Sequence, residues 1–344
     1  MSGSSYDAVL LVSFGGPEGL ADVMPFLRNV LKGRNVPESR MLEVAHHYEL
    51  FGGISPLNAQ NRDLISALRE ELAHANLNLP VYWGNRNWHP FLLDTLRQMQ
   101  NDGVRHALGF FTSAYNSYSG CRQYREDIER ARQTLGFAAP QVDKLRAFYN
   151  HPGFIEPSIE NLSRAFARIP SDRRPATCVA FTAHSIPGSM AQNCDYQDQL
   201  KAACKLVADG VGHLNWSLVY QSRSGPPGQP WLEPDILEHL TGLERNGVKD
   251  VIIAPIGFIS DHLEIVFDLD TAARQHCESI GLNMIRCATV GCHPRFVSMI
   301  RELIEERLHP NSLRLALGDR GPSHDVCPVD CCPMVSKFRG GDPA

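Results

Sequence analysis

Two segments of the sequence carry side chains that could act together on a proton or a metal ion. His184 lies in the stretch FTAHSIPGS, directly after an apolar run, and the stretch GFISDHLEIVFDLD (257–270) carries Asp261, Glu264 and Asp268. Imidazole titrates near neutral pH and carboxylates are hard oxygen ligands, so the two segments suit general acid–base work or weak, exchangeable metal binding. A pair of one imidazole and one carboxylate offers too few ligands for a closed structural zinc site, which needs four.

Each of these residues also has a purely structural interpretation. A histidine after a strand can be a buried core residue, and acidic residues at positions i, i+3 and i+7 of a helix usually face solvent. Ser260 is expected to cap this helix, with Asp261 in the first turn, where the helix dipole favours an anion. Glu264 differs because apolar residues flank it on both sides, and a carboxylate in so apolar a stretch needs a partner.

The C-terminal stretch GPSHDVCPVDCCPMVSKFRGGDPA (321–344) holds a second concentration of reactive side chains. Cys327, Cys331 and Cys332 lie close together in a polar segment, rich in Pro and Gly, that cannot build a core. Because the N-terminus lacks the basic region of a signal peptide, we expect a cytoplasmic protein, in which disulfides are rare. Metal ligation or thiol chemistry therefore explains these cysteines better than disulfide bonds do.

Positioning these groups requires an α/β fold. Short apolar runs rich in Val, Ile and Phe alternate with longer amphipathic segments, which predicts buried parallel strands joined by crossover helices. The predicted strands are residues 7–14, 80–85, 106–114, 177–185, 216–222, 249–258 and 283–290.

An internal repeat divides the chain into two halves. Residues 88–115 and 231–261 each contain a Trp, a Pro near the start of an amphipathic helix, an Asn shortly before a Gly-Val pair, and a strand. We therefore expect two similar Rossmann-like lobes, residues 6–165 and 175–312, followed by a cysteine-bearing tail, residues 313–344.

The repeat also predicts where a ligand binds. Ligands of open α/β sheets bind at the carboxyl ends of the strands, so two facing lobes predict a central cleft walled by strand-end residues. The two glycines of SFGGPEG (13–19) permit close backbone approach, but the sequence has neither a G-x-G-x-x-G motif nor a P-loop. We therefore expect no nucleotide cofactor.

Composition excludes further classes of function. The 344 residues carry a net charge of −5, which gives no sign of nucleic-acid binding. No segment reaches the roughly 18 apolar residues of a membrane-spanning helix, so we expect no transmembrane anchor.

Seven segments together resemble the ferrochelatase family, whose members insert ferrous iron into a porphyrin. They are LLVSFGGPEG, FGGISPLN, GNRNWHPF, TSAYNSYSGCRQYREDI, FTAHSIPG, YQSRSGPPGQPWLEPD and PIGFISDHLEIVFDLD, in the family's order over nearly the whole chain. The chain looks most similar to the actinobacterial branch, which resembles enzymes acting on coproporphyrin III.

The resemblance implies two facing Rossmann-like lobes and a catalytic pair, His184 and Glu264. A free porphyrin carries two pyrrole N–H protons that must leave as the metal enters, and the imidazole can accept one near neutral pH. Asp261 and Asp268 would stand behind Glu264 as a path for protons or metal.

The resemblance further implies porphyrin contacts at Ser55 and Tyr124. A helix N-cap is an alternative role for Ser55. Phe14, Tyr115 and the loop 224–231 are expected to line the apolar cleft that holds the flat ring.

Three positions depart from some relatives that act on coproporphyrin. Phe14 stands where those proteins have a tyrosine, and a phenyl ring cannot ligate iron, so the axial ligand opposite His184 stays open. Leu31 and His47 lie near positions where some relatives have an arginine, which affects the binding of propionates.

Some ferrochelatases hold a [2Fe–2S] cluster on one internal and three tail cysteines. The resemblance assigns these four ligands to Cys121, Cys327, Cys331 and Cys332, the count that such a cluster requires. Idle thiols and a zinc site are the alternatives. The other cysteines are expected to be packing residues, and they are Cys178, Cys194, Cys204, Cys277, Cys287 and Cys292.

The leading interpretation is a ferrochelatase of haem biosynthesis that inserts Fe²⁺ into coproporphyrin III or, alternatively, protoporphyrin IX. A chelatase for another metal and tetrapyrrole is the alternative among enzymes, and a haem or porphyrin carrier or an iron–sulfur sensor is the alternative from another class. The expected partners are the porphyrin and ferrous iron, with transient contacts to enzymes of the haem pathway, for a monomer or a dimer.

Overall fold

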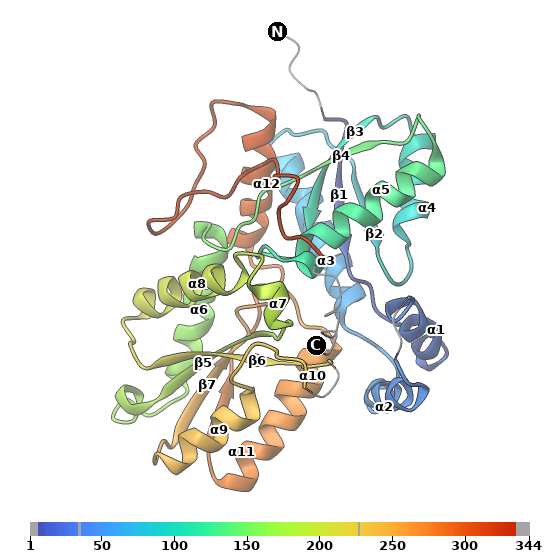
Figure 1. The fold of residues 1–344 in the computed structure, drawn as a ribbon. Helices are drawn as coiled ribbons and strands as arrows, with labels where there is room; N and C mark the ends of the chain where they lie inside the picture. The colour runs from blue at the N-terminus through green and yellow to red at the C-terminus, as the bar shows by residue number, and fades with distance from the viewer. Residues whose placement is uncertain (1–5, 34–35, 226–227, 335–344) are drawn as a thin grey trace, which may run out of the picture.

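The computed structural model describes residues 6–33, 36–225 and 228–334, which form two lobes (Figure 1). Each lobe is a parallel sheet flanked by helices. The predicted tail is described as far as residue 334, and its residues 335–344 lie outside the described residues, as do residues 226–227 of the predicted ring-binding loop.

The two sheets have the same topology. The first sheet has the order β2-β1-β3-β4 and the second the order β6-β5-β7-β8, and every strand pair is parallel. The strands are β1 (Ala8–Ser13), β2 (Val81–Asn85), β3 (His106–Phe111), β4 (Gln141–Lys144), β5 (Cys178–His184), β6 (Trp216–Gln221), β7 (Asp250–Ala254) and β8 (Asn283–Arg286). The repeat and the predicted fold class are therefore confirmed.

The central strands form because their residues are apolar on both faces. Every residue of β1 and β7 is buried, as parallel strands with helices on both sides require. The seven predicted strands are found with ends shifted by a few residues, but the edge strand β4 was missed. Its sequence, QVDK, is short, polar and partly exposed, so it lacks the apolar run by which the others were recognised.

Helices cover both sheets. Those of the first half are α1 (Leu20–Val30), α2 (Glu38–Glu49), α3 (Leu57–His74), α4 (Leu92–Asn101), the π-helical segment η1 (Tyr118–Arg122) and α5 (Gln123–Leu135). Those that follow are α6 (Pro152–Ala167), the 3₁₀ turn η2 (Arg174–Ala176), α7 (Gly188–Ala191), α8 (Tyr196–Val211), α9 (Ile236–Arg245), α10 (Leu263–Phe267), the π-helical segment η3 (Asp268–Ala273), α11 (Arg274–Ile280) and α12 (Pro294–Leu308).

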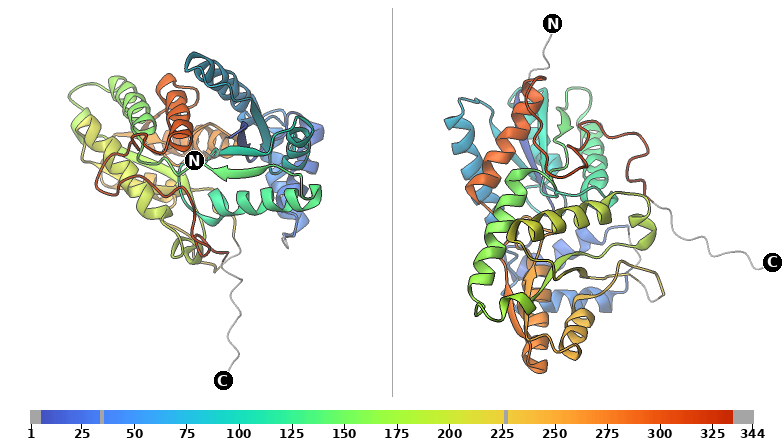
Figure 2. Two further views of the ribbon diagram at one scale, coloured as in Figure 1. Left: turned by 90° about the horizontal axis from the view of Figure 1, so that it is seen from above. Right: turned by 90° about the vertical axis from the view of Figure 1, so that its left-hand side faces the viewer.

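Two helices cross between the lobes. The helix α6 follows the first sheet in the chain but packs against α8 and contacts β7 of the second lobe. The helix α12 follows the second sheet but packs against α3 of the first lobe, and the two helices also pack against each other (Figures 1 and 2). The two helices therefore connect the lobes, and the boundaries at residues 165 and 312 stay a prediction.

The contact between α6 and α12 is close because Gly153 lies in it. A Cβ atom at Gly153 would come within 2.5 Å of the Met299 Cβ and 2.8 Å of the Arg295 carbonyl oxygen. Near this crossing, the Arg146 guanidinium donates to both carboxylate oxygens of Glu306, at 2.7 and 2.8 Å. Both side chains are almost fully buried, so the ion pair gains strength from a medium of low dielectric constant.

Along the described residues, no helix combines the length and the apolar character needed to cross a lipid bilayer.

We predict that Gly153→Ala destabilises the protein by about 1–3 kcal/mol, because the added methyl group overpacks the contact between α6 and α12. Gly242→Ala in α9 is the matched control, since a Cβ there meets nothing within 4 Å. The control should be neutral or more stable by up to about 1 kcal/mol. Urea unfolding of both variants measures the difference, and equal stabilities would contradict the prediction.

Candidate active site and thiol cluster

His184 is the last residue of β5, at the carboxyl end of the second sheet. Its Nδ1 lies 2.5 Å from the Ser185 carbonyl oxygen, which can only accept a hydrogen bond, so Nδ1 carries a hydrogen and donates it. The Tyr196 hydroxyl donates to the His184 carbonyl oxygen at 3.0 Å and fixes the backbone. The imidazole is therefore oriented with Nε2 as its free nitrogen.

Glu264 supplies the carboxylate that faces this nitrogen. Its Oε2 lies 3.4 Å from His184 Nε2, and the two side chains are 50% and 34% exposed. The structure thus brings the two predicted residues together where a ligand can reach them. The flanking Leu263 and Ile265 are buried, and the turn of α10 points Glu264 outward instead of into the core. An imidazole nitrogen beside a carboxylate oxygen can hold one proton or one cation between them.

Asp268 lies one turn further along, at the start of η3. Ser222 Oγ donates to its carboxylate, and Gln221 Nε2 donates at 3.3 Å. Burial raises the pKa of Asp268 to about 6, and the nearby charge of Glu264 acts in the same direction. Asp268 therefore adds a carboxyl group that titrates near neutral pH to the His184–Glu264 pair.

Asp261 differs from its prediction. The helix α10 begins at Leu263, and the extended residue before it, His262, makes no side-chain cap. The predicted cap at Ser260 is therefore wrong, and Asp261 lies in the loop before the helix. Its carboxylate accepts hydrogen bonds from Arg286, at 2.8 and 3.2 Å, so it does not share a helix face with Glu264.

Two of the predicted ring contacts lie at the carboxyl end of β1 and the turn packed against it. Phe14 is 37% exposed, with its ring centroid 6.0 Å from the Arg86 guanidinium carbon. Ser55 is buried, its Oγ lies 3.5 Å from the Leu57 nitrogen at the start of α3, and a Cβ at Gly16 would come within 2.6 Å of its Cβ. The hydroxyl of Ser55 therefore lies near the helix start, but the N-cap position itself is Pro56 and not Ser55.

Tyr115 and Tyr124 are placed differently from the prediction that they face the porphyrin. Tyr115 is 2% exposed, and its hydroxyl donates to the Ile256 carbonyl oxygen of the other lobe at 2.8 Å. Tyr124 is 6% exposed, with the Arg86 guanidinium 4.6 Å from its ring centroid. Both rings are interior because Tyr115 and Tyr124 each pack into a hydrophobic core.

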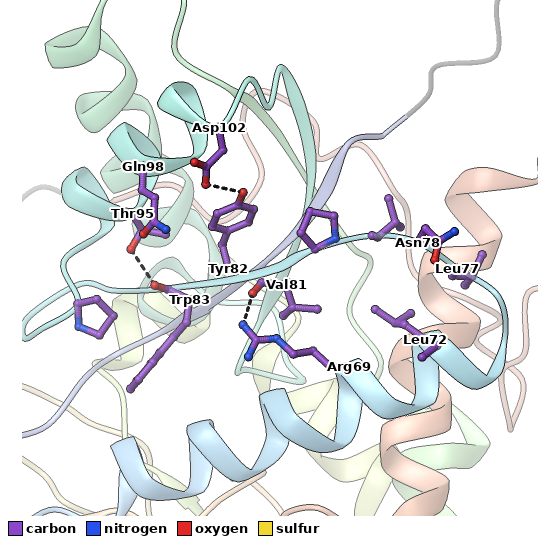
Figure 3. Close-up of a pocket in the computed structure, with 14 residues that line it drawn as sticks. Arg69, Leu72, Leu77, Asn78, Val81, Tyr82, Trp83, Thr95, Gln98 and Asp102 are labelled. Carbon is purple, nitrogen blue, oxygen red and sulfur yellow. Dashed lines mark hydrogen bonds between the residues drawn. The ribbon is translucent and has the colours of Figure 1, made fainter.

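A pocket of about 660 Å³ lies away from these residues, at the edge strand β2 (Figure 3). Two outward carbonyl groups of this strand are already paired, Val81 with Arg69 at 2.8 Å and Trp83 with Thr95 at 2.7 Å. None of the predicted site residues lines this pocket. The groups suited to proton or metal chemistry therefore lie at the sheet ends and not here.

The four predicted cluster cysteines lie side by side. The Cys331 and Cys332 sulfur atoms are 3.7 Å apart, and Cys332 is buried in hydrogen-bond contact with the thiol of Cys121. On the other side, one ligand atom each of His324, Cys327 and Cys331 lies within 4.8 Å of the others. Of the four predicted ligands, Cys327 and Cys331 therefore belong, with His324, to a group that could hold a metal ion, whereas Cys121 and Cys332 lie outside that group of three.

The described part of the tail folds back onto the first lobe through polar contacts. Arg122 of η1, next to Cys121, donates to the carbonyl oxygens of Val329 at 3.0 Å and Cys331 at 2.9 Å. Cys332 has a positive φ of 50°, and its side chain is buried. The hydrogen bond with the Cys332 thiol lowers the pKa of Cys121, and thiolate is the metal-binding form.

Two further soft donors at this site were not predicted. Cys194, expected to be a packing residue, lies in hydrogen-bond contact with Cys332, which lowers the pKa of Cys194. His324 Nε2 lies 4.0 Å from the Cys331 sulfur. The polar surroundings of Cys194 in QNCDY were the one signal in the sequence. Cys292 is exposed, contrary to the packing role expected of it, whereas Cys178, Cys204, Cys277 and Cys287 are buried as predicted.

Both π-helical segments of the described chain carry one of these groups. The segment η1 carries Cys121, and η3 begins with Asp268. A π-helical turn contains an extra residue relative to the α-helix, so it redirects side chains, and such turns are frequent at functional sites. No pattern of residue types in the sequence indicates them.

Comparison with known proteins gives one family over the whole chain. A family model described as Ferrochelatase matches residues 6–308. A protein of Rhodopirellula baltica named ferrochelatase is 55% identical, over 98% of this chain and 97% of its own length. A protein of Streptomyces coelicolor named coproporphyrin III ferrochelatase is 50% identical, over 97% of this chain and 95% of its own length.

Solved structures of chelatases share the fold. The sirohydrochlorin chelatase SirB from Bacillus subtilis subspecies spizizenii, in complex with cobalt, matches with a TM-score of 0.50 at 11% identity, covering 89% of this chain and 97% of its own. SirB from Bacillus subtilis with Fe³⁺ matches with a TM-score of 0.53 at 11% identity, covering 91% of this chain and 99% of its own. At this identity the likeness concerns the two-lobed fold.

We predict that the effect of Asp268→Asn on stability depends on pH. The folded protein binds a proton at Asp268 between pH 4 and 6, where the unfolded chain has lost it, because the pKa is raised from 3.8 to about 6. The wild type therefore loses stability as pH rises through this window, and the loss is complete above pH 6. The variant has no such group, so its stability relative to wild type should increase by about 2–3 kcal/mol between pH 4 and pH 7.

Urea unfolding at the two pH values measures this change. Asp172→Asn, at an exposed position, is the control and should show less than about a third of it. A pH-independent effect of Asp268→Asn would contradict the assignment.

Proposed function

The chain belongs to the ferrochelatase family and is an enzyme that inserts a metal ion into a porphyrin; from this premise we propose that it inserts Fe²⁺ into coproporphyrin III, as a step of haem biosynthesis in the cytoplasm. The observation that carries the proposal is the accessible His184–Glu264 pair, with Nε2 and Oε2 3.4 Å apart. The choice of porphyrin is supported by the relatives of about 50% identity that are named coproporphyrin III ferrochelatases.

Metal insertion releases the two pyrrole protons, and the residues of the site can receive them. Nδ1 of His184 is occupied by its hydrogen bond to the Ser185 carbonyl oxygen, so Nε2 accepts the first proton. The carboxylate of Glu264, beside Nε2, stabilises the imidazolium that results and accepts the second proton. Asp268, with a pKa of about 6, passes a proton onward because its two forms are both populated near neutral pH.

The same two side chains suit the entering metal. Ferrous iron binds imidazole nitrogen and carboxylate oxygen, and a site of only a few such ligands releases the ion again. We infer that Fe²⁺, as a substrate, first binds His184 Nε2 and the carboxylate of Glu264 and then exchanges these ligands for pyrrole nitrogens. The exposure of both side chains supports this order of events.

The flat face of the porphyrin is assigned to Phe14. Its ring is exposed at the carboxyl end of β1, as a stacking contact requires. Tyr115 and Tyr124 support the site from the protein interior. Tyr115 links the two lobes through its hydrogen bond to Ile256, and the ring of Tyr124 packs against the Arg86 guanidinium. Ser55 remains a proposed porphyrin contact, and its side chain packs against Gly16 in the turn after β1.

We further propose that the thiol cluster of Cys121, Cys327, Cys331 and Cys332 holds a [2Fe–2S] cluster. The proposal is supported by the number of thiols, by the 3.7 Å between the Cys331 and Cys332 sulfur atoms, and by the Cys327 and Cys331 sulfur atoms, which lie within 4.8 Å of each other. Such a cluster, when bound, supplies one-electron redox chemistry and bonds that stabilise the folded chain. The hydrogen bond from Arg122 to the Cys331 carbonyl oxygen holds the tail cysteines against the first lobe.

His184→Ala and Glu264→Gln are each expected to lower kcat by about 100-fold or more, because each removes an acceptor of a pyrrole proton. Anaerobic mixing of the protein with Fe²⁺ and coproporphyrin III, followed by the loss of porphyrin fluorescence, measures the rate. Porphyrin affinity should change less than about threefold, since neither side chain is assigned to ring binding.

His309→Ala, at an exposed position after α12, is the control and should keep the wild-type rate. A His184→Ala variant with full activity would rule out this base. A parallel reaction with protoporphyrin IX compares kcat/KM for the two porphyrins, and a higher value for protoporphyrin IX would overturn the assignment of the substrate.

Protein purified without oxygen is expected to contain iron and acid-labile sulfide, with visible absorption that Cys332→Ser abolishes. Cys332 is chosen because its thiol contacts both Cys121 and Cys331. Cys292→Ser, at an exposed thiol elsewhere, should retain iron and sulfide. Wild-type protein that contains neither, or a Cys332→Ser variant that retains both, speaks against the cluster.

A further inference from the structure

A single glutamine of the first lobe holds the backbone that leads to Glu264 in the second lobe. Gln60 lies in the first turn of α3, and its Nε2 donates to the Asp261 carbonyl oxygen at 3.1 Å. Its Oε1 accepts a hydrogen bond from the Asp261 backbone nitrogen at 2.9 Å. One side-chain amide therefore pairs with both polar backbone groups of one residue, as a neighbouring strand would.

The same residue is anchored a second time within its own lobe. Arg286, at the end of β8, donates to both carboxylate oxygens of Asp261 and, through Nε, to Asp270 at 2.7 Å. The Arg286 side chain is 14% exposed, so these charge-assisted hydrogen bonds lie in surroundings of low dielectric constant. Arg286 thus ties both ends of the segment 261–270 to the second sheet.

A further contact from the first lobe reaches this segment. The ring of His47, on α2, stacks on Phe267 with centroids 3.7 Å apart and planes at 15°. Glu264 therefore lies between two positions, Asp261 and Phe267, that touch the first lobe. His184 belongs instead to β5, in the interior of the second sheet. The separation of His184 and Glu264 depends in this way on how the first lobe holds residues 261–267.

We propose that Gln60 is a positioning residue that holds Glu264 at its working distance from His184 when the two lobes bind a porphyrin. The inference rests on the proposed function and adds a residue that touches neither the metal nor the reacting nitrogen atoms. The primary amide is essential because it both donates and accepts. A methionine of similar length does neither, and an ionised glutamate accepts only.

Gln60→Met should lower kcat for Fe²⁺ insertion into coproporphyrin III by about tenfold, the usual loss when a group that orients a metal-binding side chain is removed. The KM for the porphyrin and its dissociation constant, from fluorescence quenching, should stay within about twofold. Gln98→Met, on the exposed face of α4, is the matched control and should keep the wild-type kcat.

A double-mutant cycle separates positioning from a general structural role. In the Glu264→Gln background, Gln60→Met should change the rate by less than about twofold, since the group it positions is no longer an ionised carboxylate. Gln60→Glu gives an independent test that depends on pH. Its carboxyl group can donate to the Asp261 carbonyl oxygen only when it is protonated. Its kcat relative to wild type should rise as the pH falls below about 5.

The inference is overturned if Gln60→Met keeps the wild-type kcat, or if it lowers the rate equally in both backgrounds. It is also overturned if the loss of kcat disappears once the fraction of folded protein, from the thermal midpoint, is corrected for. These results leave the proposed function intact, because the wild type still inserts iron. A wild-type protein that inserts no iron removes both proposals together.

Discussion

The relative position of the two lobes is set where α6 and α12 cross. The helix α6 packs against α8 and β7 of the second lobe, α12 packs against α3 of the first, and Gly153 lets the two backbones approach closely. The almost fully buried Arg146–Glu306 pair closes the same region. Because one buried cluster contains residues of both sheets and of both helices, a shift of one lobe disturbs the packing of the other.

This constraint gives the active site its character. His184 and Glu264 both come from the second lobe, yet the backbone beside Glu264 is paired with Gln60 of the first. The two reacting side chains can therefore stay exposed to substrate without losing their mutual position. Tyr196 holds the His184 backbone, the Ser185 carbonyl oxygen orients the His184 ring, and Arg286 holds the carboxylate of Asp261.

Much of this arrangement could be predicted from the sequence because it depends on patterns of residue type. The apolar runs predicted the central strands, and the internal repeat predicted that the two sheets share one topology. The position of His184 directly after an apolar run predicted that it lies at the carboxyl end of a strand. The edge strand β4 was missed because it is polar. Asp261 was placed in the helix since an acidic residue suits a first turn, but a bidentate ion pair with Arg286 outweighed that preference.

What escaped prediction depends on partners far away in the chain. Tyr115 and Tyr124 are aromatic residues near expected ring contacts, and only the packing of the two cores shows that they are interior. Gln60 makes its contacts with a residue 201 positions later, and the π-helical turns η1 and η3 have no composition of their own.

The thiol cluster joins residues that a ribosome makes at very different times. Arg122, next to Cys121, bonds to Cys331, which lies 209 positions later. At ordinary rates of translation this separation corresponds to about 10–40 s. During that interval Cys121 has none of its partners from the tail. The thiol cluster can therefore form only after both lobes have been synthesised.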